Sequence, residues 1–144
     1  MQAKITRVFS FDASHILTGH RGKCKNLHGH TYTLEVEVAG DFENTEDSMV
    51  MDYGDLKKCV ESVLEQYDHA YLFNCSAELS SVERTVAELL ISKGLTATAI
   101  AGRTTTENIA SQLLTTLVSS GLNVSRVRLS ETPSTYAEVV RCIQ

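Results

Sequence analysis

The alternation of apolar and polar positions predicts strands near both ends of the chain. It runs through residues 4–12 and, more cleanly, through residues 28–39; a second pair of alternating segments covers residues 124–131 and 136–143, separated by Pro133. The apolar sides begin with Ile5, Phe9 and Phe11 in the first segment and Tyr32, Leu34, Val36 and Val38 in the second. We therefore expect four strands, in two pairs of sequence neighbours.

Helical spacing replaces this alternation between the two pairs. Residues 56–67 carry apolar side chains at the i, i+3, i+4, i+7 positions of a helix that lies on a sheet, and Asp52 is suited to cap its first turn. The spacings Ser80 to Glu83 and Thr104 to Glu107 are those of capping boxes, which predict a short and then a longer helix. These two helices are expected to end at Gly94 and Gly121.

The order strand, strand, helix, short helix, helix, strand, strand indicates an α+β fold. Paired strands with helices between the pairs favour an antiparallel sheet that carries its helices on one face. A chain of 144 residues has the length of one ordinary domain, and we expect a single domain over residues 1–144.

Composition narrows the environment and the partners. The hydrophobic fraction is 42%, and no apolar run approaches the ~18 residues of a membrane span. The N-terminus has alternating charges in place of the apolar region of a signal peptide, so we expect a cytoplasmic protein without a membrane partner. The net charge of −5 argues against nucleic acid as a partner.

The histidines are the strongest sign of chemistry. His28 and His30 are one residue apart on a predicted strand, so their imidazoles point to the same side. His15, at the end of the first apolar segment, would complete the three-nitrogen set of a catalytic Zn²⁺ with one open position. The alternative is that the histidines are ordinary polar residues at strand ends.

Cys24 stands apart from the other cysteines, which lack CxxC spacing, because it lies four residues before His28. A thiol beside a dication or an imidazolium is easily converted to the thiolate, which can act as a base. Two other interpretations stay open: Cys24 as a fourth ligand of a structural zinc, or as an inert loop thiol.

Carboxylates provide two further candidate sites. Asp68 and His69 follow the first helix, and a carboxylate can orient an imidazole that shuttles protons, although adjacency alone does not show that the side chains touch. The alternative is that they are ordinary polar residues at a helix C-terminus. Glu131 ends an apolar strand face, where a carboxylate is costly unless something pairs with it; the alternative is an exposed strand end beside Pro133.

Taken in chain order, these residues resemble a known family. The matching motifs are Phe11-Asp12-Ala13-Ser14-His15, Cys24, His28-Gly29-His30, Asp52, Asp68-His69 with Leu72 and Asn74, Thr105-Thr106-Glu107-Asn108, and Glu131-Thr132. Together they resemble the family of 6-pyruvoyltetrahydropterin and 6-carboxytetrahydropterin synthases over nearly the whole chain. The three-residue gap between Cys24 and His28 is more similar to the bacterial 6-carboxytetrahydropterin synthases.

The resemblance implies an architecture. It implies the tunnelling fold, a four-stranded antiparallel sheet with two main helices on one face. Three subunits of this fold close a barrel, and two trimers form a homohexamer with active sites at subunit interfaces. The closure is physically sensible, because a ring removes unpaired sheet edges.

The resemblance also implies residue roles. It makes His15, His28 and His30 the Zn²⁺ ligands, and Cys24, Asp68 and His69 the catalytic residues. Glu131 would anchor the pterin, and Thr106 and Glu107 would line its pocket, although a capping role explains Glu107 equally well. Triphosphate binding would fall to basic residues such as Arg21, Lys23 or Lys25, among which the sequence does not choose.

The implied reaction converts 7,8-dihydroneopterin triphosphate to 6-carboxy-5,6,7,8-tetrahydropterin with release of acetaldehyde and triphosphate, on the queuosine and 7-deazaguanine route. One alternative is the pyruvoyl synthase reaction, which keeps the three-carbon side chain. Another is a non-catalytic pterin-binding or zinc-stabilised oligomerisation module. Two departures from the family pattern are the long connection over residues 75–103 and a last strand, Tyr136-Ala137-Glu138, without the family's tyrosine-x-glycine ending.

Overall fold

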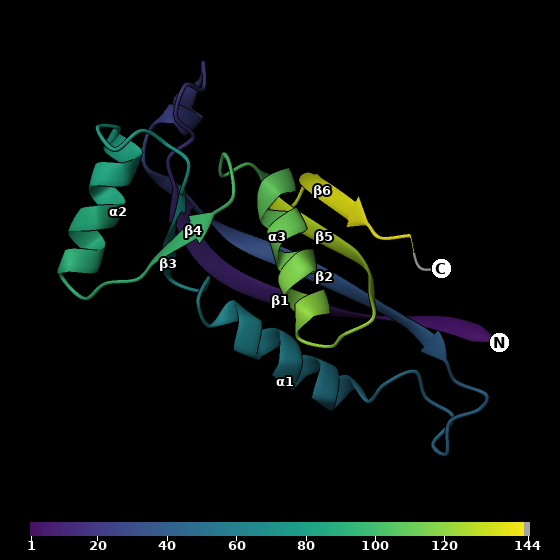
Figure 1. Ribbon diagram of the computed structural model, residues 1–144. Coiled ribbons are helices and arrows are strands. Elements are labelled where there is room, and N and C mark those ends of the chain that lie inside the picture. The colour runs from purple at the N-terminus through teal and green to yellow at the C-terminus, as the bar shows by residue number, and fades with distance from the viewer. Residues whose placement is uncertain (143–144) are drawn as a thin grey trace.

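A computed structural model of the chain describes residues 1–142, which form one curved sheet of six strands with three α-helices (Figure 1). The strands are β1 (Gln2–His15), β2 (His28–Asp41), β3 (Ala70–Asn74), β4 (Ala97–Ile100), β5 (Val124–Thr132) and β6 (Thr135–Val140). The helices are α1 (Tyr53–Leu64), α2 (Val82–Ser92) and α3 (Thr106–Ser119), and a short 3-10 turn, η1, spans Lys23–Lys25. The strand order is β4-β3-β1-β2-β5-β6.

The long antiparallel pair of β1 and β2 is the centre of the sheet. Its register runs without interruption from Gln2 opposite Asp41 to His15 opposite His28. Because the register has no bulge, the alternation of the two strands stays in phase, and Phe11 and Tyr32 face the same side as the histidines. β1 therefore extends past residue 12, where its sequence pattern was expected to end, and carries His15 into the sheet.

The prediction of a four-stranded, wholly antiparallel sheet is wrong. The additional strands β3 and β4 lie in the long connections, where β3 pairs parallel with β1 and β4 pairs parallel with β3. Residues 70–74 read Ala-Tyr-Leu-Phe-Asn, a short run without alternation, as is usual for a parallel strand covered on both faces. Such a run carries no period-two signal, which is why the sequence pattern missed it.

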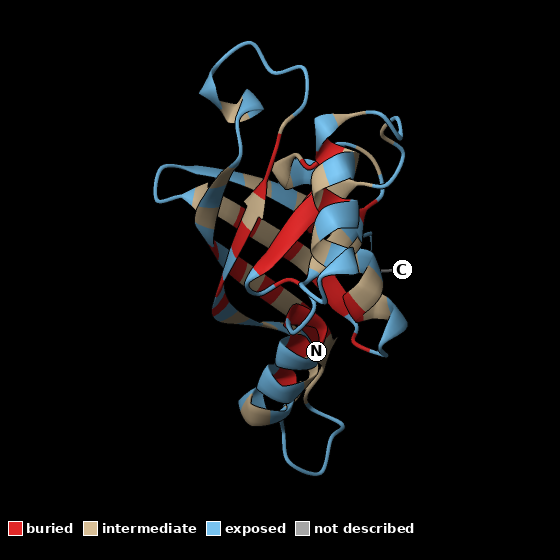
Figure 2. Cartoon of the chain, turned by 90° about the vertical axis from the view of Figure 1, so that its left-hand side faces the viewer, coloured by how far each residue is buried: buried red, intermediate tan, exposed pale blue. Residues whose placement is uncertain are grey.

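Two helices cover one face of the sheet, as predicted, and the main core lies beneath them (Figures 1 and 2). α1 contributes Leu56, Val60, Val63 and Leu64, and α3 contributes Ile109, Ala110, Leu113 and Leu117. They pack on side chains of the central strands that include Phe9, Phe11, Tyr32, Leu34 and Val36. In Figure 2 the buried parts of the strands and helices meet along this face.

The helix starts are partly as predicted. Asp52 caps α1, its carboxylate accepting hydrogen bonds from the backbone N–H groups of Gly54 and Asp55. Both capping-box predictions are wrong by one residue, because the residues that cap these helices are Ser81 and Thr105. The neighbouring Ser or Thr can cap equally well, and burial decides which of the two residues caps each helix. Glu83 and Thr104 are buried in the protein, at 3% and 1% exposure.

The other ends also differ slightly from the predictions. α1 ends at Leu64, although Tyr67 beyond it is still part of the main core. β6 ends at Val140, and Ile143, which was expected in the last strand, lies outside the described residues. No helix within residues 1–142 is both long and apolar enough to cross a membrane.

A smaller core lies apart from the main one, under α2. Ile16, Tyr71 and Ala87 are its buried members, with Val86 and Leu90 of α2 packed around them. This core joins α2 to β3 and to the segment that directly follows His15.

Candidate functional site

Three imidazoles meet where the β1–β2 ladder ends. The ligand nitrogens of His15, His28 and His30 all lie within 4.8 Å of one another. His15 and His28 are opposite each other in the register, and their Nε2 atoms are 3.1 Å apart. The convergence expected from the spacing of the histidines is therefore present in one chain.

Hydrogen bonds to the backbone determine which ring nitrogen of His15 and of His28 is available to a metal ion. His15 Nδ1 lies 2.9 Å from the carbonyl oxygen of Thr104, and His28 Nδ1 lies 2.7 Å from that of Asn26. A carbonyl only accepts, so both Nδ1 atoms donate, and in a neutral ring the Nε2 atom then carries a lone pair. Two such lone pairs face each other across 3.1 Å.

This donor set fits a metal ion. His30 Nε2 is buried and has no hydrogen-bond partner within residues 1–142. Burial lowers the pKa of His15 and of His30, which favours the neutral rings that a metal needs. Backbone carbonyls that hold the far ring nitrogen are the usual support of zinc-bound histidine. Without a cation, the facing lone pairs would repel and the buried nitrogen would stay unsatisfied.

Asp68 and His69 do touch, with 3.0 Å between the Asp68 carboxylate and His69 Nδ1. Asp12 of β1 holds both residues: its N–H donates to the Asp68 carboxylate at 2.9 Å, and its carbonyl accepts the His69 N–H at 2.6 Å. The bond from the Asp12 N–H, together with the His69 ring, lowers the pKa of Asp68. His69 adopts a left-handed backbone, φ 58°, which turns the chain into β3.

Asp68 lies at the edge of β1, where its carboxylate accepts from the Asp12 N–H, and the His69 ring lies beside the Asp12 carboxylate. His15 shares its side of β1 with Phe11, whereas Asp12 points to the other side, where Thr31 donates a hydrogen bond to its carboxylate. His69 lines an open cavity of about 400 Å³ together with Asp12, Thr31 and His30. Nothing in the sequence pattern had signalled this placement.

Cys24 lies in η1, in the loop between β1 and β2. It is half-buried, and its carbonyl oxygen accepts a hydrogen bond from Leu17 N–H at 3.0 Å. Its sulfur is not among the ligand atoms that gather within 4.8 Å around the histidines in residues 1–142. This geometry gives no support to Cys24 as a fourth metal ligand.

Glu131 lies near the histidines, at a bulge in β5 between Ser130 and Thr132. It is half-buried and lines a cavity of about 630 Å³ that also reaches His30. Burial raises the pKa of the Tyr32 phenol, and the negative charge of Glu131 raises it further.

The other predicted pterin contacts lie at the start of α3. Thr106 is its first residue and is half-buried, and Glu107 is exposed in its first turn. The cap is Thr105, whose hydroxyl accepts from Asn108 N–H, so the capping explanation for Glu107 loses its partner Thr104. Thr104 itself is a residue that sequence reasoning misassigned, since its carbonyl holds His15.

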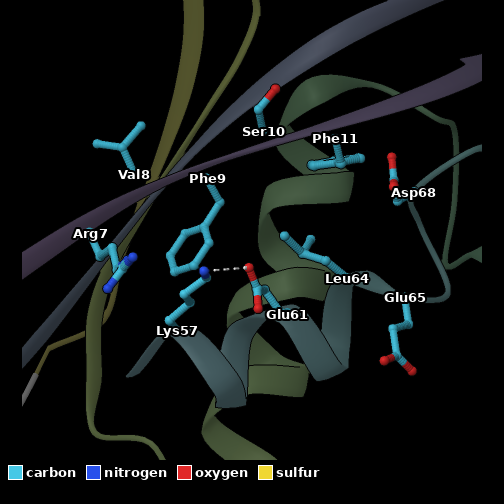
Figure 3. A pocket seen from close by; sticks show the side chains of 10 residues that line it. All are labelled: Arg7, Val8, Phe9, Ser10, Phe11, Lys57, Glu61, Leu64, Glu65 and Asp68. Atoms are coloured by element: carbon cyan, nitrogen blue, oxygen red, sulfur yellow. Dashed lines mark ion pairs between the residues drawn. The ribbon is translucent and has the colours of Figure 1, made fainter. Parts of the chain in front are cut away.

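A further cavity, of about 460 Å³, lies between β1 and α1 (Figure 3). Its walls include Arg7 and Phe9 of β1, the ion pair Lys57–Glu61 of α1, and Asp68. β3 pairs with β1 only from Ala13 to His15. The edge of β1 before Ala13 is therefore open along this cavity within the described chain.

Known proteins resemble this chain over most of its length. The family model described as 6-pyruvoyl tetrahydropterin synthase matches residues 4–142. The 6-carboxy-5,6,7,8-tetrahydropterin synthase of Haemophilus influenzae is 42% identical over 139 residues, covering 94% of this chain and 96% of that protein. The enzyme of the same name from Rickettsia bellii is 33% identical over 144 residues, covering 94% and 99%.

Solved structures agree in fold. The 6-pyruvoyl tetrahydropterin synthase of Caenorhabditis elegans matches with a TM-score of 0.69 at 25% identity, covering 99% of this chain and 97% of that one. The Plasmodium falciparum 6-pyruvoyl tetrahydropterin synthase matches in fold with a TM-score of 0.75 at 20% identity, covering 99% of each chain. With the motifs, the fold and these matches in agreement, the chain belongs to the 6-pyruvoyl tetrahydropterin synthase family.

Proposed function

We propose that the protein is a zinc-dependent lyase that converts 7,8-dihydroneopterin triphosphate and one water molecule to 6-carboxy-5,6,7,8-tetrahydropterin, acetaldehyde and triphosphate. The observation that carries the proposal is the histidine cluster, in which two Nε2 lone pairs face each other and a third Nε2 is buried without a partner in residues 1–142. The names of the two bacterial relatives support the carboxy product over the pyruvoyl product.

His15, His28 and His30 would hold the zinc ion. When bound, the ion would polarise the hydroxyl groups of the substrate side chain and make the neighbouring C–H bonds more acidic. The carbonyl oxygens of Thr104 and Asn26 keep the Nε2 atoms of His15 and His28 free for this purpose.

Cys24, Asp68 and His69 would move the protons. The Cys24 thiolate accepts a proton from the substrate side chain, and His69 carries a proton to or from the opposite side of the reacting carbon. Asp68 holds the His69 ring by its Nδ1 atom at 3.0 Å, which leaves Nε2 to face the substrate. A binding module would have no need for these groups, which favours an enzyme over a non-catalytic protein.

Glu131 would recognise the pterin. Its carboxylate offers two acceptor oxygens to the 2-amino group and ring N–H of the substrate, and it lies at the cavity that reaches His30. Thr106 and Glu107, at the start of α3, would line the same pocket. The exposed side chains of Arg21, Lys23 and Lys25 surround Cys24 in sequence and would attract the triphosphate.

The active site would be shared between subunits. Asp12, which holds this pair, points to the side of the sheet opposite to His15, so a substrate at the zinc of one copy would meet Asp68 and His69 from another copy. The open edge of β1 and the edge strand β6 offer backbone partners for such contacts. We propose the homohexamer of two stacked trimers on this basis, in a cytoplasmic protein of the queuosine route.

One assay tests the proposal. The purified protein is loaded with Zn²⁺, its metal content is measured, and it is incubated with 7,8-dihydroneopterin triphosphate while products are identified by mass spectrometry. The expected products are 6-carboxytetrahydropterin, acetaldehyde and triphosphate. A product that keeps three side-chain carbons, without acetaldehyde, would assign the pyruvoyl reaction, and the absence of free triphosphate would favour a non-catalytic pterin-binding module.

A further inference from the structure

The long connection over residues 75–103 has no part in the reaction described above, yet its helix α2 is well anchored. The smaller core joins Ala87 of α2 to Tyr71 of β3 and to Ile16, the residue after His15. The Tyr71 hydroxyl also donates to the Glu83 backbone carbonyl at 3.2 Å. α2 is therefore packed on the chain segment that leads from the first zinc ligand toward Cys24.

A buried carboxylate reinforces this contact. Glu83 of α2 is 3% exposed, and each of its oxygens has a partner. Oε2 accepts from the Thr18 hydroxyl at 2.9 Å, and Oε1 accepts from the Asn74 N–H at the end of β3 at 2.7 Å. A buried carboxylate is costly without such bonds, so this side chain holds the segment after His15 to the end of β3.

The segment held in this way supports the loop of Cys24. Ile16 is fixed in the smaller core and Thr18 is fixed by Glu83; between them, the Leu17 N–H donates to the Cys24 carbonyl at 3.0 Å. Arg103, at the other end of the same connection, donates to the Thr18 carbonyl at 3.0 Å. The connection therefore holds Ile16 and Thr18, the two neighbours of Leu17. Leu17 in turn holds the backbone of Cys24.

We propose that α2 is a brace for the Cys24 loop and that Glu83 is a positioning residue, which sets the place of the thiol relative to the histidine cluster. The proposal rests on the proposed role of Cys24 in turnover. Glu83 itself does not meet the substrate: it acts through Thr18, Leu17 and the Cys24 backbone. The extra length of the connection, which had no explanation in the sequence, then serves the catalytic loop.

The test compares four proteins as zinc-loaded full-length chains: the wild type, Glu83→Ala, Glu83→Gln and Glu88→Ala. Glutamine keeps an acceptor for Asn74 N–H and a polar partner for Thr18, so it is the rescue variant. Glu88 lies on the same helix but is exposed, so its replacement is the matched control. The readouts are amide hydrogen exchange of a peptide covering residues 16–27, zinc content, kcat and KM.

The brace predicts a specific pattern. In Glu83→Ala, exchange within residues 16–27 accelerates about tenfold or more and kcat falls by about 10- to 100-fold, since a small misplacement of a reacting group has such effects. Zinc content stays at the wild-type value and KM changes by less than about twofold, because the ligands and the pterin contacts are untouched. Glu83→Gln and Glu88→Ala behave as the wild type.

Other outcomes overturn the proposal. A Glu83→Ala protein that is less stable, but has wild-type exchange in residues 16–27 and wild-type kcat per zinc-loaded molecule, shows that Glu83 serves the fold alone. Faster exchange with unchanged kcat contradicts the positioning role. If the wild type itself does not turn over, the proposed function fails, while the exchange comparison still decides whether α2 braces the loop.

A second variant covers the case in which Glu83→Ala does not fold. Thr18→Val removes the hydroxyl that Glu83 holds and leaves α2 unchanged. We expect the same pattern in exchange and kcat with a smaller amplitude, because Ile16 and Arg103 still hold the segment. Wild-type exchange and kcat in Thr18→Val would contradict the brace.

Discussion

The two faces of the β1–β2 ladder carry chemistry of different kinds. On the helix-covered face, His15, His28 and His30 converge within one chain, with backbone carbonyls holding two of the rings. On the open face, Asp68 and His69 form a pair held to the edge of β1, with the His69 side chain 77% exposed. The first site gathers three ring nitrogens within one chain, whereas the second is an exposed carboxylate–imidazole pair beside open cavities.

In the proposed function, this difference lets one sheet contribute two half-sites. Adjacent residues of a strand point to opposite faces, so His15 and the neighbouring Asp12 segment supply different sites from almost the same stretch of chain. Rigid burial suits metal ligands, which must keep a fixed geometry. An exposed pair at an open edge suits groups that act on the substrate of a neighbouring subunit.

The largest effect is expected at Cys24. Replacing Cys24 with alanine removes the proposed base and is expected to lower kcat by about 1,000-fold, within the range for a lost acid–base group. The zinc content, measured by elemental analysis, is expected to stay at the wild-type value, because the sulfur is not among the clustered ligand atoms. Loss of the metal in this variant would make Cys24 a ligand instead and would move it into the helix-covered site.

The next largest effect is expected when one histidine of the helix-covered face is removed. His30→Ala leaves two imidazoles, and zinc affinity, measured by competition with a chelator, is expected to fall by more than about 100-fold. Asp12→Asn, on the other face, is the matched control and is expected to bind zinc as the wild type does. Equal zinc affinity in His30→Ala and the wild type would contradict the metal site.

On the open face, the expected effect is smaller and has no metal component. Asp68→Asn keeps the shape but removes the charge that orients and polarises His69, so kcat is expected to fall by about 100-fold with normal zinc content. The measurement is steady-state turnover of zinc-loaded protein. Loss of zinc in this variant would show that the two faces are not independent.

The smallest expected effect is a change of stability with pH, which depends on His15 and His30. Burial lowers the pKa of His15 and His30 in the folded chain, so below the unfolded value of about 6.5 the unfolded state binds more protons than the metal-free folded state. The free energy of unfolding of chelator-treated protein is therefore expected to fall as the pH is lowered through that value, as urea titrations would show. A rise in stability over the same interval would contradict neutral, buried rings.

Part of this arrangement was predictable from sequence. The spacing of His28 and His30 predicts one shared face, and the clean alternation of residues 28–39 predicts the strand that carries them. Asp52 was predictable as a cap because it stands directly before a strong helical pattern. These inferences depend only on local periodicity, which tertiary packing did not override.

The rest depends on contacts between distant segments. β3 and β4 are short parallel strands without alternation, so no local pattern marks them. The capping-box spacing points to Ser80–Glu83 and Thr104–Glu107, but packing buries Glu83 and Thr104, and the caps are Ser81 and Thr105. The position of Asp68 and His69 relative to the three histidines depends on the edge of β1 to which the chain returns after α1. The order of all the strands in the sheet sets that edge.

Subunit complementation tests the shared site most directly. Cys24→Ala and His69→Ala proteins, each inactive alone, are unfolded together, refolded with Zn²⁺ and assayed with 7,8-dihydroneopterin triphosphate. If Cys24 and His69 come from different copies, random mixing of equal amounts leaves about a quarter of the sites intact, and about a quarter of the wild-type activity returns. Activity no higher than that of the two variants refolded separately would contradict an active site shared between subunits.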